Sequence, residues 1–271
     1  MPSDPTSFAD RDPWLAPFRD VVGRRDLYYG QVRNKIAKMG GLLGPISTGH
    51  QYFGLNRGEL DRLPGYWYRE WAPEATHISL IGDFNGWDRR VHPALKDEYG
   101  VWHLFMPDME IQDLLLHEGR YKVSVTTKHG RMDRIPAYAR RVMQESDGSF
   151  SARIWMPAQG HIFQNPRPVV GANQGLKIYE AHIGMAQDAE KIGSYDEFRL
   201  QILPRIKALG YNAIQLMGIL EHPYYASFGY LVSSFFAPSS RFGTPDQLKD
   251  LIDTAHGMGI LVLSTWFIAT P

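Results

Sequence analysis

Glu221 and His222 open the stretch of this chain whose residue types are best suited to bind a sugar. Residues 218–243 are unusually rich in aromatic side chains: Tyr224, Tyr225, Phe228, Tyr230, Phe235, Phe236 and Phe242. Flat aromatic faces stack on the CH faces of sugar rings, and Glu221, His222 and Ser227 offer hydrogen-bonding partners for sugar hydroxyl groups. The alternative interpretation is that most of these rings pack in the core of a barrel rim. The density of rings on one segment favours a site.

The flanking segments predict the elements that would position this run. Apolar strands are expected over residues 177–182, 212–217 and 260–263. A helix between the first two begins at a capping box, Ser194 with Glu197, and ends at Gly210. Its apolar face is Phe198, Ile202, Ile206 and Leu209. A second helix begins at Thr244 and carries Leu248, Leu251, Ile252 and Ala255 on its apolar face.

This order of strands and helices predicts consecutive βαβ units around a parallel sheet. Binding groups in such units collect on the loops that leave the C-terminal ends of the strands. The loop over residues 218–243 is far longer than the usual few residues, so we expect the sugar-binding groups there.

Three blocks within this region resemble the 1,4-α-glucan (glycogen) branching enzymes, in the eukaryotic-like branch of the α-amylase superfamily. The blocks are residues 179–185, 215–230 and 235–244, and the resemblance extends over nearly the whole chain. It implies that residues 169–271 form the first three βα units of an incomplete (β/α)8 TIM barrel. It also implies that Tyr230 stacks on the sugar at the cleavage site, with Glu221, His222 and Tyr225 as further substrate-binding residues.

The same resemblance implies that no catalytic residue lies in this chain. Retaining glycosyl transfer needs two carboxyl groups about 5 Å apart, and in the superfamily these come from the fourth, fifth and seventh barrel strands. Glu180 and Glu221 are weak substitutes. The family also expects an Asp and a His where this chain has Thr265 and Thr270. A truncation or frame change near residue 264, or a divergent non-catalytic protein, would explain this departure.

Residues 60–168 read as a separate all-β sandwich. Short strands, separated by turn signals, are expected over residues 66–71, 77–82, 101–106, 120–126 and 152–155. The turn over residues 81–87 and the segment 119–123 resemble the glycan-binding module in front of branching and debranching enzymes. This resemblance implies that Trp87 and Lys122 contact glucose units, with Asn85 in the same turn. The alternative for Trp87 is a buried indole that anchors the turn.

Residues 1–59 are expected to form a helical lead. Asp12 reads as the N-cap of a short helix with Phe18, Val21 and Val22 on its inner face. A second helix is expected over residues 27–39, ended by Gly40 and Gly41.

Composition limits the class of function further. Acidic and basic residues balance at 29 each, so neither nucleic acid nor an anionic membrane is favoured as a partner. The chain has no cysteine and no ligand-spaced histidines, and we expect no metal, no cofactor and a cytoplasmic location. The expected partner is an α-1,4-glucan. Two other functions stay open: a non-catalytic α-glucan-binding protein, and the front part of a debranching or amylase-type hydrolase.

Overall fold

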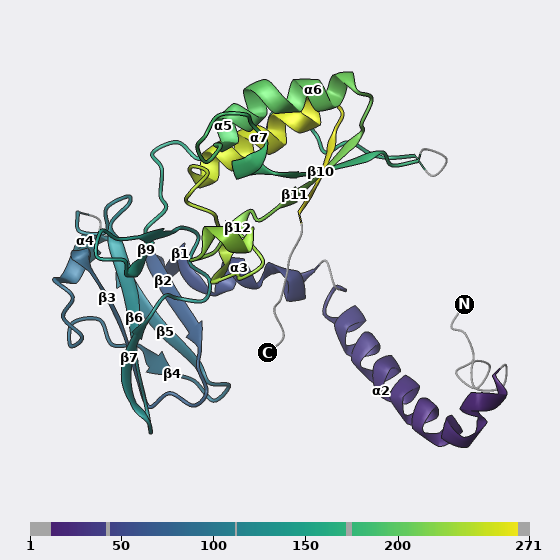
Figure 1. Ribbon diagram of the computed structural model, residues 1–271. Helices are drawn as coiled ribbons and strands as arrows, with labels where there is room; N and C mark the ends of the chain where they lie inside the picture. Colours follow the sequence, from purple (N-terminus) through teal and green to yellow (C-terminus); the bar gives the residue numbers. More distant parts are fainter. Residues whose placement is uncertain (1–11, 42–43, 112, 172–174, 265–271) are drawn as a thin grey trace. The chain divides into compact units, whose positions relative to one another are not determined.

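The computed structural model describes residues 12–41, 44–111, 113–171 and 175–264. Two compact units divide the chain, Met1–Tyr52 and Phe53–Pro271 (Figure 1). None of the helices within the described ranges is long and apolar enough to cross a membrane.

The first unit contains η1 (Pro13–Phe18), the α-helix α2 (Arg19–Lys38), η2 (Pro45–Thr48) and α3 (Gly49–Tyr52). The Trp14 amide donates a hydrogen bond to Asp12 Oδ1 at 2.9 Å, which confirms the predicted N-cap. The predicted break between two helices is wrong, because no proline interrupts residues 19–38 and the glycines are accommodated within one helix. The predicted inner face is also wrong: no residue of α2 is buried, and Phe18 is 57% exposed.

A β-sandwich begins the second unit. Its first sheet has the order β1 (Gly54–Leu60), β2 (Leu63–Trp71), β5 (Val101–Pro107) and β4 (Leu95–Lys96). The second has the order β3 (His77–Gly82), β6 (Arg120–Thr127), β9 (Phe150–Arg153) and β8 (Val142–Gln144), with β7 (Gly130–Arg134) also paired to β6. The short helices η3 (Asp83–Asn85) and α4 (Asp108–Ile111) connect strands.

The two sheets enclose a common apolar core. Alternate residues of the strands point into it, among them Tyr68, Ile78, Leu80, Trp102 and Val123. Strand β1 differs from the expected boundary at residue 59, because residues 54–60 pair with β2 along their whole length and so belong to the sandwich.

The last part of the unit is a parallel three-stranded sheet, with the order β10 (Ile178–His182), β11 (Ala213–Met217) and β14 (Leu261–Ser264). The turn η4 (Ile183–Met185) follows β10 directly. The helix α7 (Pro245–Gly257) precedes β14, and Figure 1 shows it on the same side of the sheet as the helical run between β10 and β11. The predicted cap at Thr244 is confirmed, since the Gln247 amide donates to Thr244 Oγ1 at 3.2 Å.

The helical run between β10 and β11 consists of α5 (Tyr195–Glu197), the π-helical turn η5 (Phe198–Ile202) and α6 (Leu203–Ala208). The predicted capping box is present: the Glu197 amide donates to Ser194 Oγ at 3.1 Å. Pro204 explains the π turn, because it has no N–H to donate and its ring would clash with the carbonyl four residues earlier. Of the predicted apolar face, Phe198 and Ile206 are buried as expected. Leu209 was predicted to face the core but is 69% exposed, because it is the C-cap beyond the last residue of α6.

The long loop after β11 contains structure of its own. A two-stranded antiparallel ladder, β12 (Leu220–Glu221) with β13 (Ser234–Pro238), encloses the turn η6 (Tyr225–Ser227). Two glycines with positive φ, Gly218 and Gly229, cross at the base of the loop. A Cβ on Gly229 would lie 2.1 Å from the Cα of Gly218, so only glycine allows this crossing.

Candidate functional site

Glu221 is a buried carboxylate that holds the two ends of the long loop together. Glu221 is only 1% exposed, and its Oε2 accepts a hydrogen bond from the Ser240 amide at 2.6 Å. Its backbone oxygen accepts from the amide and the hydroxyl of Ser233. Burial raises the pKa of Glu221, although the hydrogen bonds from Ser240 oppose this shift. The Glu221 carboxylate is therefore bonded within the protein and is not exposed to a ligand at the surface.

His222 and His182 are two buried histidines, and both rings pack against Phe242. Nδ1 of His222 lies 2.8 Å from the Leu220 carbonyl, and burial lowers the pKa of His222. His182 packs edge-on against Tyr225, Phe228 and Phe242, with ring centroids 5.5–6.0 Å apart. Its pKa is lowered by burial and by the nearby His222. Both rings therefore favour the neutral form and act as parts of an aromatic cluster.

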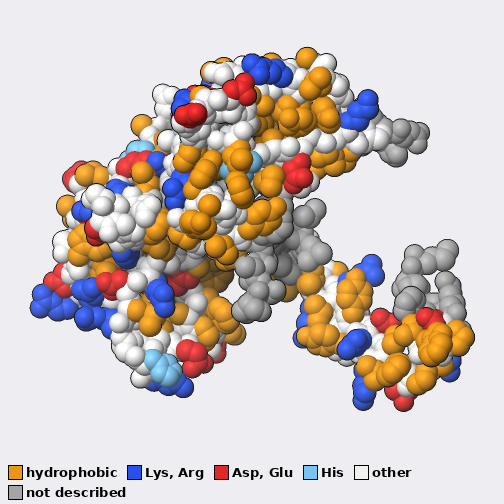
Figure 2. Space-filling model, viewed as in Figure 1, with side chains coloured by type: hydrophobic (Ala, Val, Ile, Leu, Met, Phe, Trp, Pro, Cys, Tyr) orange, Lys and Arg blue, Asp and Glu red, His pale blue; other side chains and the backbone are white. Residues whose placement is uncertain are grey.

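Six of the seven aromatic rings of the long loop are at least partly exposed. Tyr224 is 60% exposed, Tyr230 42%, Phe228 41%, Phe235 39% and Phe236 38%. Tyr225 is half-buried, and burial raises the pKa of its hydroxyl. Figure 2 shows hydrophobic side chains gathered on the surface of this part of the molecule. The structure thus separates the predicted site residues into two buried ones, Glu221 and His222, and two that reach the surface, Tyr225 and Tyr230.

Phe236 joins the long loop to the sandwich. Its ring stacks on Tyr138 with centroids 4.2 Å apart and an interplanar angle of 19°. Arg141 supports the same junction, because its Nη1 donates to the Gly243 carbonyl at 3.1 Å. These two contacts fix the loop against the module that precedes it in the chain.

Asp83 organises the turn that was predicted to bind glycan in the sandwich. It accepts hydrogen bonds from the backbone amide and guanidinium of Arg120 and from Trp87 Nε1. Burial works against the charge of Asp83, but the bonds from Arg120 and Trp87 outweigh it and lower the pKa of this carboxyl. Trp87 is half-buried, with the Arg120 guanidinium 5.8 Å from the centre of its ring.

Asn85 and Lys122 occupy different environments beside this turn. The Asn85 side chain accepts from the Gly82 amide and donates to the Leu80 carbonyl, both at 3.0 Å, so its amide is used within the turn. Lys122 is half-buried on β6, opposite Ile81 of β3. It shares with Arg120 the face of β6 that points away from the core. Arg120, which lies over the Trp87 ring, and Lys122 therefore share the outer face of β6, whereas the amide of Asn85 is used within the turn.

The remaining carboxylates considered from the sequence do not form a pair. Glu180 is exposed and accepts from Gln215 Nε2 at 3.0 Å, whereas Glu221 is buried against Ser240. Across the described ranges there is no group of three or more His, Cys, Asp or Glu that could hold a metal ion. Thr265 and Thr270 lie outside the described residues.

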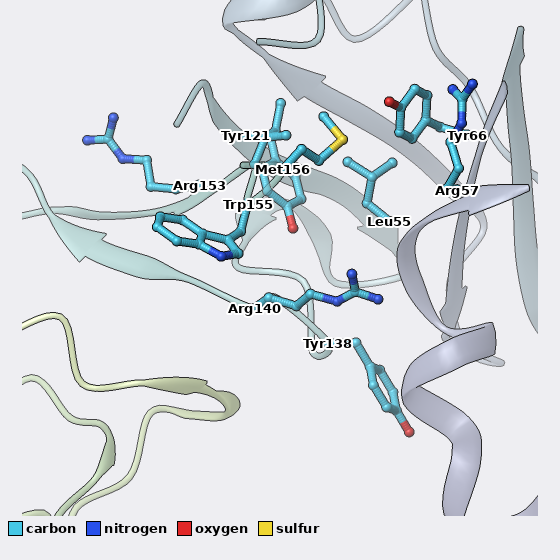
Figure 3. A pocket seen from close by; sticks show the side chains of 10 residues that line it. Leu55, Arg57, Tyr66, Tyr121, Tyr138, Arg140, Arg153, Trp155 and Met156 are labelled. Atoms are coloured by element: carbon cyan, nitrogen blue, oxygen red, sulfur yellow. The ribbon is translucent and has the colours of Figure 1, made fainter. Parts of the chain in front are cut away.

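Two features that sequence reasoning missed involve side chains brought together by the sandwich. Trp71 is 62% exposed at the end of β2, and its Nε1 donates to the carbonyl of Tyr99, itself 74% exposed, at 3.2 Å. A cavity of about 260 Å³ lies between the strands (Figure 3). It is lined by Leu55, Arg57, Tyr66, Tyr121, Tyr138, Arg140, Arg153, Ile154, Trp155 and Met156. These residues are spread over about a hundred positions of the sequence, so no local motif predicts that they line one cavity.

Comparison with known proteins places the sandwich in a described family. Residues 52–139 match carbohydrate-binding module 48, the isoamylase N-terminal domain. This stretch includes the Asp83–Trp87 turn, Trp71 and Lys122.

Curated proteins named 1,4-alpha-glucan-branching enzyme are similar to nearly the whole chain. The one from Emericella nidulans is 44% identical over 267 residues, and the one from Dictyostelium discoideum is 42% identical over 266 residues. These alignments cover 97% and 96% of this chain but only 38% of each relative. The resemblance found in the sequence is confirmed, and the chain corresponds to the N-terminal part of such proteins.

Solved structures show the fold at lower identity. A putative alpha amylase from Salmonella typhimurium has a TM-score of 0.60 and 21% identity, over 78% of this chain and 32% of that chain. A Group B Streptococcus pullulanase has a TM-score of 0.62 and 18% identity, over 78% of this chain and 33% of that chain. At such identity the likeness shows an α-amylase-like fold and nothing of the reaction.

Proposed function

We propose that this chain is the N-terminal, glucan-binding part of a 1,4-α-glucan branching enzyme. The reaction of such an enzyme transfers a segment of α-1,4-glucan to a 6-hydroxyl group, in glycogen or starch synthesis. The observation that carries the proposal is the identity of 42–46% over 93–97% of the chain to proteins of that name. The match of residues 52–139 to a carbohydrate-binding module supports the glucan-binding role.

The proposed domains are a helical lead over residues 1–59, a glycan-binding sandwich over 60–168, and the first three βα units of a (β/α)8 barrel over 169–271. The parallel order β10–β11–β14, with a helix before each of the last two strands, supports the third of these. The pairing of residues 54–60 into the sandwich moves the first boundary to about residue 53.

Within the long loop, Tyr230 and Tyr225 are the proposed sugar-facing residues. Tyr230 is exposed, and Tyr225, five residues earlier in the same loop, is half-buried, so both residues have surface that a glucose unit can contact. Glu221 and His222 act as positioning residues, because the buried bonds of Glu221 to Ser240 and Ser233 fix the loop that presents the tyrosines. Among the described residues, Glu180 and Glu221 bond to different groups, and we propose that neither acts as nucleophile or acid/base.

Glucan binding and branching are tested separately. The chain should sediment together with glycogen. Soluble maltoheptaose should compete and release it, whereas a β-linked glucan, the control, should not. Amylose stained with iodine should keep its spectrum when incubated with the chain alone. Retention on glycogen that maltoheptaose cannot reverse would contradict α-glucan binding, and a reproducible change of the iodine spectrum would show that carboxylates within this chain catalyse transfer.

A non-catalytic α-glucan-binding protein is the second candidate. It is favoured by one observation, that Glu180 and Glu221 contact different groups and form no pair within the described residues. For this second candidate the same two assays would also give glycogen binding without transfer. Adding the remaining part of a relative's barrel in trans distinguishes the two candidates, because only the branching-enzyme proposal predicts that transfer activity then appears. A cytoplasmic location accompanies either function.

A further inference from the structure

The cavity between the sandwich strands gathers hydrogen-bond donors that no group of the described protein satisfies. Three arginines line it and no carboxylate does. Arg57 pairs with Asp108 and Arg153 with Glu145, both outside the lining. Arg140 has no carboxylate partner among the described residues; its Nη2 donates to the amide oxygen of Asn56. Arg140 is exposed, so it brings to the edge of the cavity a positive charge that no described carboxylate pairs.

Asn56 holds the Arg140 guanidinium at the cavity. Asn56 is only 8% exposed, and its own Nδ2 donates to the Phe53 carbonyl at 2.8 Å, which fixes the amide oxygen toward Arg140. One of the five N–H groups of a guanidinium is used in this way. The other N–H groups have no acceptor among the described residues, and Arg140 lines the cavity with the planar guanidinium that suits an oxyanion.

Two further donors lie beside Arg140. Tyr121 is 3% exposed, and within the described part of the chain its hydroxyl makes no hydrogen bond. The charge of Arg140 acts directly on this hydroxyl, although burial is the larger influence and raises the pKa of Tyr121. Trp155 Nε1 is buried and likewise unpartnered. Figure 3 shows the hydroxyl of Tyr121 and the indole nitrogen of Trp155 on the side of Arg140.

Trp155 cannot easily turn its indole nitrogen elsewhere. The Arg141 guanidinium lies 5.1 Å from the centre of its ring, and His117 packs against it at 4.7 Å. A buried donor without an acceptor costs about 1–3 kcal/mol, so this arrangement calls for a ligand with acceptor oxygens. The walls formed by Leu55, Met156 and Tyr138 are apolar or aromatic.

We infer that this cavity, here called the Arg140 pocket, binds the phosphate group of a small phosphomonoester. The guanidinium of Arg140 and the two neutral donors match the charge and the acceptor oxygens of a phosphate, whereas a neutral sugar would make no use of the charge of Arg140. A water molecule occupies about 30 Å³ in the liquid, so a cavity of about 260 Å³ accommodates more than a bare phosphate group. The ester portion of the ligand packs against Leu55, Met156 and Tyr138. This inference is independent of the proposed α-glucan site at Tyr230.

The test compares glucose 6-phosphate, inorganic phosphate and glucose on the whole chain, by calorimetric titration and by the indole N–H resonance of Trp155 in ¹⁵N-labelled protein, assigned with Trp155→Phe. Glucose 6-phosphate should bind in the millimolar range or tighter and shift that resonance. Inorganic phosphate should bind more weakly, and glucose should not bind there. No shift of the Trp155 resonance with either phosphate would overturn the inference. Equal binding of glucose would overturn the phosphate assignment, and equal binding of inorganic phosphate would overturn the assignment to an ester.

Three variants locate the site. Arg140→Gln should weaken glucose 6-phosphate binding at least about tenfold, because a charge-assisted contact is lost. Tyr121→Phe should weaken it severalfold without affecting folding, because the lost hydroxyl has no partner in the described protein. Arg131→Gln, which removes the same charge from the exposed β6–β7 hairpin, is the matched control and should bind as the parent does. A loss in Arg131→Gln equal to that in Arg140→Gln, or unchanged binding in Tyr121→Phe, would contradict the site.

Discussion

Trp87 Nε1 donates a hydrogen bond to Asp83 Oδ1 at 3.1 Å, across the turn that follows β3. Asp83 also binds the backbone and side chain of Arg120 on β6, so one carboxylate ties the indole to the neighbouring strand. The two interpretations of Trp87, as turn anchor and as sugar platform, are therefore compatible. The edge of the indole is anchored through its nitrogen while the ring remains half-exposed.

Trp87→Ala should remove maltoheptaose binding at the sandwich and leave the module folded. The reason is that the anchoring bond belongs to an exposed turn, whereas the core is formed by other residues such as Tyr68 and Trp102. Binding of the parent should be weak, near millimolar, since about −4 kcal/mol is what one stacked ring and one charged group can give. Titration calorimetry measures the binding and circular dichroism the fold.

Trp87→Phe is the matched comparison, because it keeps a ring and loses the bond to Asp83. It should retain part of the affinity. If Trp87→Ala stays folded and binds maltoheptaose as the parent does, the sugar contact at Trp87 is wrong.

In Asp83→Asn, the free energy of unfolding should fall less steeply with decreasing pH than in the parent. The pKa of Asp83 lies below its ordinary value of 3.8, so its contribution to stability is fully present above that value and disappears as the pH falls through the lower, folded value. The side chain is 39% exposed, which limits this contribution to about 1 kcal/mol or less. Urea unfolding between neutral pH and pH 3 measures it.

Asp188→Asn serves as the control for Asp83→Asn, because Asp188 is exposed and makes no ion pair with a described residue. The dependence of the unfolding free energy of this control variant on acidic pH should match that of the parent. Identical pH profiles for Asp83→Asn and the parent would refute a stabilising role of the Asp83 bonds.

Glu221→Ala should destabilise the long loop by about 1–3 kcal/mol, because it leaves the buried Ser240 amide without an acceptor. Glu221→Gln keeps an acceptor oxygen and should cost much less. Burial raises the pKa of Glu221 above its ordinary value of 4.5, so the parent loses stability as the pH rises from 4.5 through the raised, folded value. The Gln variant should lack that loss, and chemical unfolding at several pH values shows which holds.

Gly229→Ala should be clearly more damaging than Gly148→Ala. Both glycines have positive φ, +84° and +83°, so each alanine carries the left-handed penalty of about 1–2 kcal/mol. A Cβ on Gly148 meets open space, whereas one on Gly229 would lie 2.1 Å from the Gly218 Cα. Thermal unfolding of the two variants isolates the clash, and equal shifts in Tm would mean that the Gly218–Gly229 crossing can relax.

Elements with local sequence signals were predictable before the fold was known. The capping boxes at Ser194 and Thr244, the strands of the sandwich and the turn at Asp83–Trp87 are written in neighbouring residues, and the structure contains them. The likeness to branching enzymes was also readable, because it is carried by contiguous blocks. Pro204 was visible too, but the π turn before it was not predicted, and neither was the exposure of Leu209 at the C-cap of α6.

Which site residues reach the surface depends on tertiary contacts that the sequence does not reveal. Glu221 and Tyr230 belong to one loop and one sequence block, yet Glu221 is 1% exposed and Tyr230 42%. That difference arises because Ser240, nineteen residues away from Glu221, closes over its carboxylate. The Arg140 pocket likewise exists only after β1, β6 and the segment after β9 come together. Hydrogen bonds and cavities between residues far apart in the chain leave no periodic signal in it, so they are fixed by packing alone.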